Sequence, residues 1–290
     1  MTEKTQLTGI TLAAIGALCW STAGVIVRGL AVTDWEMVFW RSFFLTLFLL
    51  PFLLARPRQV VIEIRSSWGV MLASGLLLAT SFVCFIVAIA RTPVANILFM
   101  IAAAPLLTAL IGHLFFGESV PPRTILAILA AATGVLIMVA DSLRMDGLFG
   151  VVMAFAVALS VSINTNVIRR YRNVRLWPAV FLAGLFSMAV AAPFAMPSHP
   201  QPWDWAGLAF LGIVQIGLGM VFFIRGAQQI PAARAMIVGL LEVVLGPIWV
   251  WLFYQEQPTP LALTGGAVVV AAVVCDALFG GRAARKAVNS

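Results

Sequence analysis

The chain has 290 residues, of which 62% are hydrophobic and only 10% are charged. A soluble domain has roughly 45–50% apolar and about 25% charged residues, so this composition excludes an ordinary soluble core. The formal net charge of +7 comes from basic residues that lie between apolar stretches, and this pattern argues against a nucleic-acid partner. A helix of about 20 apolar residues crosses a hydrocarbon layer of roughly 30 Å while satisfying its own backbone hydrogen bonds. The composition therefore predicts an all-α polytopic membrane protein.

Apolar runs, read against charges, prolines and glycines, predict ten membrane-spanning helices. The first run, from Thr8 to Val27, is longer than the apolar core of a cleaved signal peptide, so we expect it to remain as the first span. Loops are mostly short, and the longest covers residues 56–67. The predicted spans are 8–28, 34–55, 68–90, 94–116, 123–141, 147–168, 177–195, 204–227, 232–254 and 259–280.

The distribution of Lys and Arg predicts the orientation. With the N-terminus inside, fourteen of the eighteen basic residues are cytoplasmic, and Arg28, Arg91 and Arg144 lie outside. Arg41 falls within the second span. Because cytoplasmic loops carry the excess of Lys and Arg, both termini are expected in the cytoplasm of a cell with a bacterial-type inner membrane.

Sliding the chain against itself gives six identities at an offset of 138 residues, which suggests a duplication into residues 1–142 and 143–290. Each half holds five spans, and an odd number reverses the orientation of the second half. Inverted repeats around a central cavity are typical of secondary transporters. The identities are Gly9 with Gly147, Pro93 with Pro231, Ala95 with Ala233, Phe115 with Phe253, Glu118 with Glu256, and Pro122 with Pro260.

Particular residues add a family resemblance: Trp20-Ser21 in the first span, Arg41 in the second, and the Pro-Xaa-Ala…Glu blocks of both halves. With the two five-helix units, the chain resembles the EamA-type branch of the drug/metabolite transporter superfamily, and most closely its aromatic and general amino-acid exporters. The resemblance implies a central cavity lined by spans three, four, eight and nine, and export of metabolites. One departure is Ala179, which stands where the offset would place a partner for Arg41.

Polar groups inside spans are costly and are therefore functional candidates. Glu242 lies midway along span nine. It fits a proton-coupled exchanger or a contact with a substrate amino group, and equally a structural hydrogen bond or ion pair with another helix, Arg41 being one partner. Arg41 itself lies about two turns from the outer end of span two, so we expect it to snorkel or to form an ion pair rather than bind a substrate carboxylate.

Further polar and aromatic side chains in the spans suit a substrate with charged ends and an apolar body, because a binding site needs apolar walls and few orienting groups. Each of them fits an interhelical hydrogen bond or a lipid-facing position as well. The candidates for substrate binding, besides Glu242, are Trp20, Thr80, Ser81, Phe85, Asn96, Met100 and Gln215.

Pro105 in span four and Pro247 in span nine are predicted to break or bend their helices near mid-membrane, and interruptions in corresponding spans point to a binding site. The alternative is a packing kink. Asn164 in span six is a candidate for an inner gate, although polar residues of this size also let helices approach closely.

Other functions fit less well. The only histidines are His113 and His199, no residue has a catalytic context, and no phosphate-binding Gly-Xaa4-Gly-Lys motif is present. Three cysteines without metal or redox spacing are expected to be structural. The sequence thus predicts a secondary or facilitative exporter of small metabolites, most simply amino acids, without cofactor or metal. A multidrug or other metabolite carrier is the alternative, followed by a receptor or scaffold.

Overall fold

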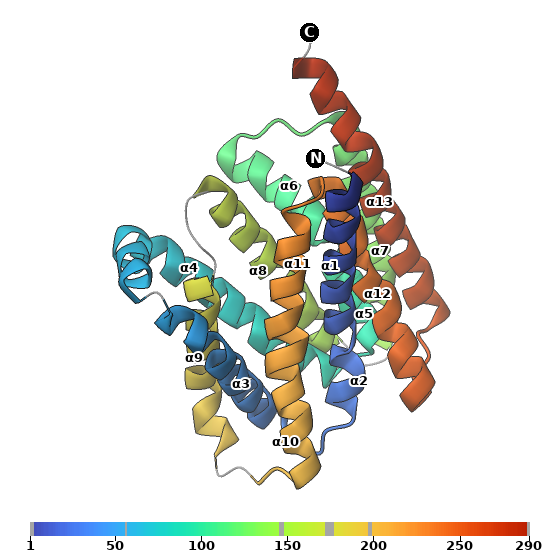
Figure 1. The fold of residues 1–290 in the computed structure, drawn as a ribbon. Coiled ribbons are helices and arrows are strands. Elements are labelled where there is room, and N and C mark those ends of the chain that lie inside the picture. Colours follow the sequence, from blue (N-terminus) through green and yellow to red (C-terminus); the bar gives the residue numbers. More distant parts are fainter. Residues whose placement is uncertain (1–2, 56, 145–147, 172–176, 197–198, 289–290) are drawn as a thin grey trace.

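The computed structural model describes residues 3–55, 57–144, 148–171, 177–196 and 199–288. All regular structure in these ranges is helical (Figure 1). Gly147 of the predicted repeat lies outside the described ranges, as do Arg56, Arg172 and Arg175, which are among the basic residues predicted to be cytoplasmic. The helices are α1 (Glu3–Ser21), α2 (Ala23–Arg28), α3 (Asp34–Leu54), α4 (Pro57–Ile89), α5 (Val94–Ala102), α6 (Ala104–Phe116), α7 (Pro122–Arg144), α8 (Leu148–Arg170), α9 (Trp177–Ala195), α10 (Pro202–Ala209), η1 (Phe210–Leu218), α11 (Gly219–Ala227), α12 (Ala232–Tyr254) and α13 (Pro260–Val288).

Ten helical segments of the described chain are long and apolar enough to span a membrane, which confirms the ten predicted spans. The predicted loop at 56–67 is different, because α4 begins at Pro57 and continues with a kink at Ser67, where φ is −138° and ψ is 29°. Proline is well suited to a first helical position. The exposed Ile62 lies on this extension, and the exposed Trp68 follows the kink, as expected for helical turns at the membrane interface.

Three spans depart from a regular α-helix. Span one divides at Thr22 and span four at Ala103, and both residues have φ −75° and ψ −10°. In span four, Pro105 follows the break at the start of α6, because proline has no N–H for the continuing helix. Span eight contains the π-helical segment η1 between α10 and α11. Pro247 does not divide its span: α12 passes through it without interruption.

The bundle is held together by helices that are distant in sequence. The most extensive packing joins α13 to α7, α4 to α8, α3 to α9, and α1 to α11 and α12. The closest approach of α7 and α13 depends on two glycines, since a Cβ on Gly134 would lie 2.5 Å from the carbonyl oxygen of Gly265, and one on Gly265 would lie 2.6 Å from that of Gly134. Small residues of this kind allow tight helix packing in membranes.

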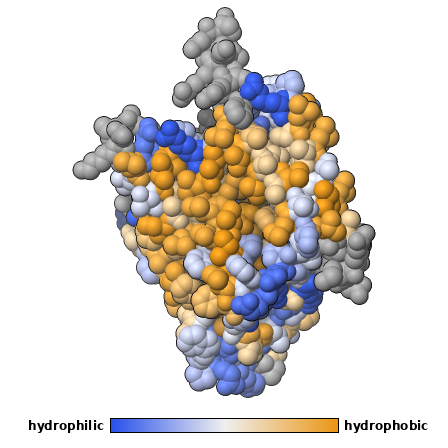
Figure 2. Space-filling view, turned by 90° about the vertical axis from the view of Figure 1, so that its right-hand side faces the viewer, coloured by the Kyte–Doolittle hydropathy of each residue, from blue (hydrophilic) through white to orange (hydrophobic). Residues whose placement is uncertain are grey.

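The outer surface suits lipid. Figure 2 shows one face on which hydrophobic residues cover the middle and hydrophilic residues gather towards the two ends. Large apolar side chains such as Leu126 and Leu136 of α7 are 67% and 66% exposed. Such a continuous apolar surface would be a liability in water, whereas the hydrocarbon layer covers it.

The two ends of the bundle carry different loops. In Figure 1 the N- and C-termini lie at the upper end, together with the loop between α6 and α7. The loops from α2 to α3 and from α12 to α13 lie at the lower end. These two ends are called below the Glu118 end and the Glu256 end, after the glutamates of the α6–α7 and α12–α13 loops.

Candidate functional site

Arg41 on α3 is a buried cation within the bundle. Its side chain belongs to a residue that is only 3% exposed, and its guanidinium carbon lies 5.5 Å from the ring centre of Phe82 and 5.7 Å from that of Phe85, both on α4. Nη1 is buried without a hydrogen-bond partner, and no ion pair joins Arg41 to the described acidic residues. The expectation of snorkelling or an ion pair is therefore wrong, because α4 covers the side chain and no described carboxylate forms an ion pair with it.

Gln215 is a second buried polar group on the helix next to α3. It lies in η1, is 5% exposed, and its Oε1 has no hydrogen-bond partner. The segment η1 packs on α3 near Arg41: a Cβ on Gly212 would lie 2.5 Å from the carbonyl oxygen of Arg41. π-Helical turns are rare and are frequent at functional sites. Gln215 was a candidate because of its polarity, but no sequence pattern predicted the π-helical backbone.

Glu242 is half-buried in α12. It forms no hydrogen bond or ion pair with other described residues, so the suggested ion pair with Arg41 is not present in this conformation. A carboxyl group inside a span without a protein partner suits a group that meets a proton or a ligand.

The other predicted substrate-binding residues occupy separate surroundings. Ser81, Phe85 and Asn96 are buried, whereas Thr80 is exposed and its hydroxyl donates to the carbonyl oxygen of Leu76 in its own helix. Thr80 therefore does not share the buried face of Ser81 and Phe85. Trp20 packs with its ring centre 4.7 Å from that of Phe223.

Three predicted residues line three different hollows. Met100 faces an apolar cavity of 270 Å³ between α5, α6, α7 and α8. Pro247 lines a groove of 470 Å³ together with Phe99 and Trp251. Pro105 lines a cavity of 610 Å³ at the Glu118 end, whose walls include Thr108, Thr165, Arg169, Met236 and Asp276.

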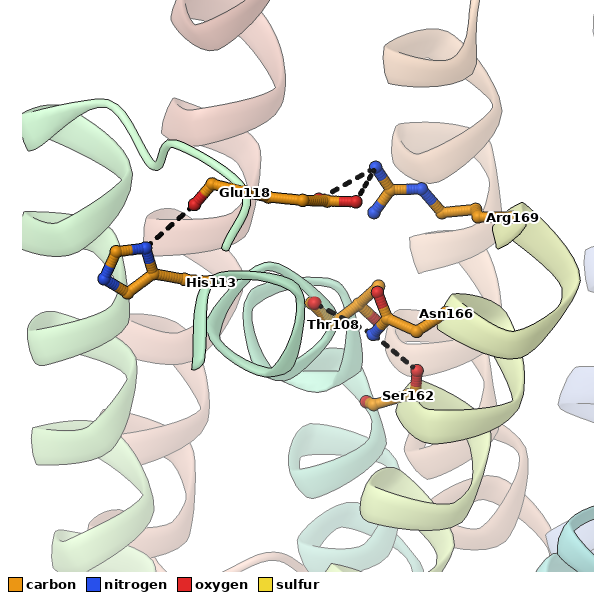
Figure 3. Close-up of polar contacts among 6 residues, drawn as sticks. All are labelled: Thr108, His113, Glu118, Ser162, Asn166 and Arg169. Atoms are coloured by element: carbon orange, nitrogen blue, oxygen red, sulfur yellow. Dashed lines mark hydrogen bonds and ion pairs between the residues drawn. The ribbon is translucent and has the colours of Figure 1, made fainter. Parts of the chain in front are cut away.

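The 610 Å³ cavity is bordered by a polar network between α6 and α8 (Figure 3). Glu118 pairs with Arg169 at 3.1 Å, and the carbonyl oxygen of Glu118 lies 2.8 Å from Nδ1 of His113. Deeper in the bundle, Asn166 donates to the carbonyl oxygens of Thr108 and Ser162 at 3.0 and 3.1 Å. The network fastens the loop after α6 to the end of α8.

Asn164, the predicted gate residue, lies on a different face of α8. It is 6% exposed, and its Oδ1 accepts a hydrogen bond of 2.6 Å from the hydroxyl of Ser74 on α4. The residue thus joins the third and sixth spans. A gating role for Asn164 stays a prediction.

A second ion pair, between Arg28 and Glu256, lies at the Glu256 end of the bundle. Arg28, the last residue of α2, donates through Nε to Glu256 at 2.9 Å and through Nη2 to the carbonyl oxygen of Thr92 at 3.2 Å. The other oxygen of Glu256 accepts 2.9 Å from the backbone N–H of Val94 at the start of α5. Spans one and four and the loop between spans nine and ten meet at this pair.

Glu118 and Glu256 were recognised in the sequence only as markers of the repeat, and no functional role was predicted for either. Their arginine partners lie 51 and 228 residues away along the chain, so no local pattern could pair them. The one available signal was that each glutamate follows a predicted span end in the same Phe-Xaa-Xaa-Glu block.

A metal centre is not indicated by the described side chains. They contain no group of three or more His, Cys, Asp or Glu residues arranged to hold a metal ion. The three cysteines, Cys19, Cys84 and Cys275, are all free.

Comparison with known proteins gives the family. The profile of the EamA-like transporter family matches residues 7–140 and 148–275. The chain is 28% identical over 278 residues to the pseudopaline exporter CntI of Pseudomonas aeruginosa, which covers 93% of this chain and 95% of that protein. It is 25% identical to a riboflavin transporter of Rhizobium johnstonii (90% of each chain) and 24% identical to an S-adenosylmethionine uptake transporter of Rickettsia conorii (92% and 91%).

The fold is also known. A solved crystal structure matches 97% of this chain and 99% of its own with a TM-score of 0.65 at 18% sequence identity. The bacterial relatives assign the protein to the inner membrane, and its family makes it a transporter rather than an enzyme. With its ten apolar spans, the chain belongs to the EamA-like transporter family and is a multi-pass membrane protein that carries small molecules.

Proposed function

We propose that this chain exports small metabolites of the amino-acid type as a secondary or facilitative carrier. In this mechanism two five-helix halves of opposite orientation, divided near residues 142 and 143, open the bundle alternately at its Glu118 end and its Glu256 end. The Glu118 end faces the cytoplasm, as do both termini.

The observation that carries the proposal is the reciprocal pairing of the two halves. Glu118 of the first half pairs with Arg169 near the end of α8, the first span of the second half. Glu256 of the second half pairs with Arg28 at the end of the first span of the first half. Alternate opening requires a contact between the two halves at each end of the bundle, and these two ion pairs provide such contacts.

Backbone geometry supports the duplication. Gly117 and Gln255, separated by the offset of 138 residues, both take the left-handed conformation, with φ 65° and ψ 21° and with φ 56° and ψ 21°. Pro93 and Pro231, at the same offset, precede α5 and α12 with φ −55° and ψ 139° and with φ −58° and ψ 142°. Helix starts and helix ends thus agree in pairs between residues 93–118 and 231–256.

The names of the relatives support small metabolites as substrates, since they are transporters of pseudopaline, riboflavin and S-adenosylmethionine. The amino-acid class rests on this chain's own residues. Glu242, without a partner in its span, suits a contact with a substrate ammonium group or a proton. The remaining walls of the substrate path are proposed to include Trp20, Ser81, Phe85, Asn96, Met100 and Gln215.

Transport is tested with purified protein in liposomes. A labelled panel of phenylalanine, leucine, glutamate and arginine, with tetraphenylphosphonium as a lipophilic cation, is followed with and without a pH gradient for the wild type and Glu242→Gln. We expect movement of amino acids by the wild type and a loss of about tenfold or more in the variant. Movement of the lipophilic cation alone would contradict the amino-acid class, and movement of no solute would contradict the transport proposal.

Alternate opening is tested by locking one end. In a background without Cys19, Cys84 and Cys275, the changes Arg28→Cys and Glu256→Cys allow a bismaleimide to bridge the Glu256 end. The matched control is the same variant capped with N-ethylmaleimide, which lacks the ion pair but keeps both cysteines independent. We expect transport in the capped protein and none in the bridged protein; equal rates would contradict alternate opening.

A further inference from the structure

We propose that Arg41, held over the rings of Phe82 and Phe85, binds the carboxylate group of the transported substrate. This proposal rests on the transport function proposed above and names the chemical group that the carrier recognises. It reverses the sequence-based expectation for Arg41.

Arg41 lacks a counter-ion among the described residues. Arg41 is 3% exposed, its Nη1 has no hydrogen-bond partner, and the described chain supplies no carboxylate to it. Buried charges in proteins are normally paired, because removing an ion from water is expensive. An intramembrane arginine without a protein partner is therefore best explained by a partner that comes and goes.

The position of the Arg41 guanidinium relative to two aromatic rings also supports the proposal. Phe82 and Phe85 lie one helical turn apart on α4, and both ring centres are within 6 Å of the guanidinium carbon. Contacts with ring faces stabilise the cation while leaving its N–H groups, which point outward in the guanidinium plane, available for an acceptor. A carboxylate accepts N–H bonds from a guanidinium group, so it matches the unpartnered Nη1 of Arg41 in charge and in shape.

A buried polar residue on the neighbouring helix η1 also supports the proposal. Gln215, also buried and with an unpartnered Oε1, lies in the π-helical segment that packs on α3 next to Arg41. The adjacent helices α3 and η1 thus each carry a buried group without a hydrogen-bond partner: the donor Nη1 of Arg41 and the acceptor Oε1 of Gln215. A substrate with a carboxylate and an N–H group supplies what both lack, as an amino acid does.

The proposal predicts opposite effects on binding and on stability. Replacing Arg41 with Met keeps an unbranched side chain of similar length and removes an unpaired buried charge. We expect Arg41→Met to melt at the same temperature as the wild type or higher when no ligand is present, and to lose carboxylate binding. If Arg41 only packed the helices through its ring contacts, the same variant would melt at a lower temperature.

Binding is measured by calorimetry on purified protein in detergent. The probes are 3-phenylpropionate, phenylalanine, acetate and glutamate as carboxylates, with 2-phenylethylamine as the matched amine. We expect the wild type to bind at least one carboxylate more tightly than the amine, and a loss in carboxylate affinity of about ten- to a hundredfold in Arg41→Met. Arg41→Lys, which keeps the charge but not the fork, is expected to lose less.

The control is Arg91→Gln. Arg91 also lies over an aromatic ring, with its guanidinium carbon 5.4 Å from the ring centre of Phe149, but it is exposed and paired with Asp34. We expect its carboxylate affinity to equal that of the wild type.

Each outcome decides the proposal. Carboxylate binding that is absent in the wild type, or unchanged in Arg41→Met, would overturn it. Since binding is measured at equilibrium and transport in liposomes, the two proposals fail separately: Arg41-dependent binding without transport would contradict only the carrier function, and transport without Arg41-dependent binding would contradict only this site.

Discussion

The two ends of the bundle carry glutamate–arginine pairs made of the same parts in different surroundings. At the Glu256 end the side chains of Arg28 and Glu256 are 26% and 23% exposed, and backbone groups of Thr92 and Val94 extend the network. At the Glu118 end the side chains of Arg169 and Glu118 are 51% and 43% exposed and border a 610 Å³ cavity. The glutamate–arginine pair is thus less exposed at the Glu256 end than at the Glu118 end, and it has additional hydrogen bonds to the backbone there.

The difference teaches that equivalent sequence blocks need not have equivalent environments. If the halves exchange conformations, this structure has its Glu256 end closed and its Glu118 end more open. Four predictions test that comparison, and the first has the largest expected effect.

Chemical access to the two ends is expected to differ most. In the cysteine-free background, Thr165→Cys places a thiol in the wall of the 610 Å³ cavity, and Thr92→Cys places one next to the half-buried Arg28–Glu256 pair, where Thr92 is 4% exposed. A water-soluble maleimide should label the first at least about tenfold faster, because reactivity requires an accessible thiolate. The labelling rates are measured by mass spectrometry. Equal rates for the two cysteines, or faster labelling of Thr92→Cys, would contradict a closed Glu256 end.

Removing the glutamate at the closed end is expected to have the next largest effect. Glu256→Gln leaves the Arg28 guanidinium and the Val94 N–H without their charged acceptor, which we expect to cost about 1–3 kcal/mol of closure. Labelling of Thr92→Cys should rise in this variant, and its transport rate should fall. The charge-swapped variant with Arg28→Glu and Glu256→Arg is the control and should recover part of the loss; no rise in labelling would mean that the pair does not hold this end closed.

The corresponding change at the open end should matter less. Exposed ion pairs contribute about 0–1 kcal/mol and are screened by salt, so Glu118→Gln is expected to change transport less than Glu256→Gln. High salt should reduce the difference between Glu118→Gln and the wild type. Transport rates at low and high ionic strength measure both, and a larger loss from Glu118→Gln would reverse the assignment of the two ends.

The smallest effect concerns the two left-handed residues. Gln255 has a φ of 56°, which glycine takes without strain, and its counterpart Gly117 has a φ of 65°. We expect Gln255→Gly to raise the stability by up to about 1 kcal/mol and Gly117→Gln to lower it by a similar amount. Thermal melting in detergent measures both, and destabilisation by Gln255→Gly would show that the Gln255 side chain is needed at that position.

Much of the fold could be predicted from the sequence, and much of the candidate site could not. The ten spans follow from apolar length, which is a local property. The first part of α4, which begins at Pro57, was not predicted because it carries charged residues and lies before the span that starts at Arg65. Pro105 follows a helix break, whereas α12 continues through Pro247, since a helix tolerates one missing N–H where neighbouring helices support it.

For the site residues, the sequence could not show which side chains from other helices surround each of them. Arg41 was recognised as unusual, but its burial under Phe82 and Phe85, and the absence of an ion pair to it among the described residues, depend on how α3 and α4 pack. Gln215 was selected for its polarity and Thr80 for its position in a polar stretch. Only the packed structure separates the buried Gln215 from the exposed Thr80.

The sequence by itself determined that this protein lives in a membrane, that it has ten spans, and that it belongs to a transporter family, because hydrophobic length and motif blocks are encoded residue by residue. Only the tertiary structure decided which charges are paired. The arginine partners of Glu118 and Glu256 come from the opposite halves of the chain, and Arg41 has none among the described residues. In a low-dielectric bundle the consequence of a charge depends on what lies within a few ångströms of it, and that is fixed by helices distant in sequence.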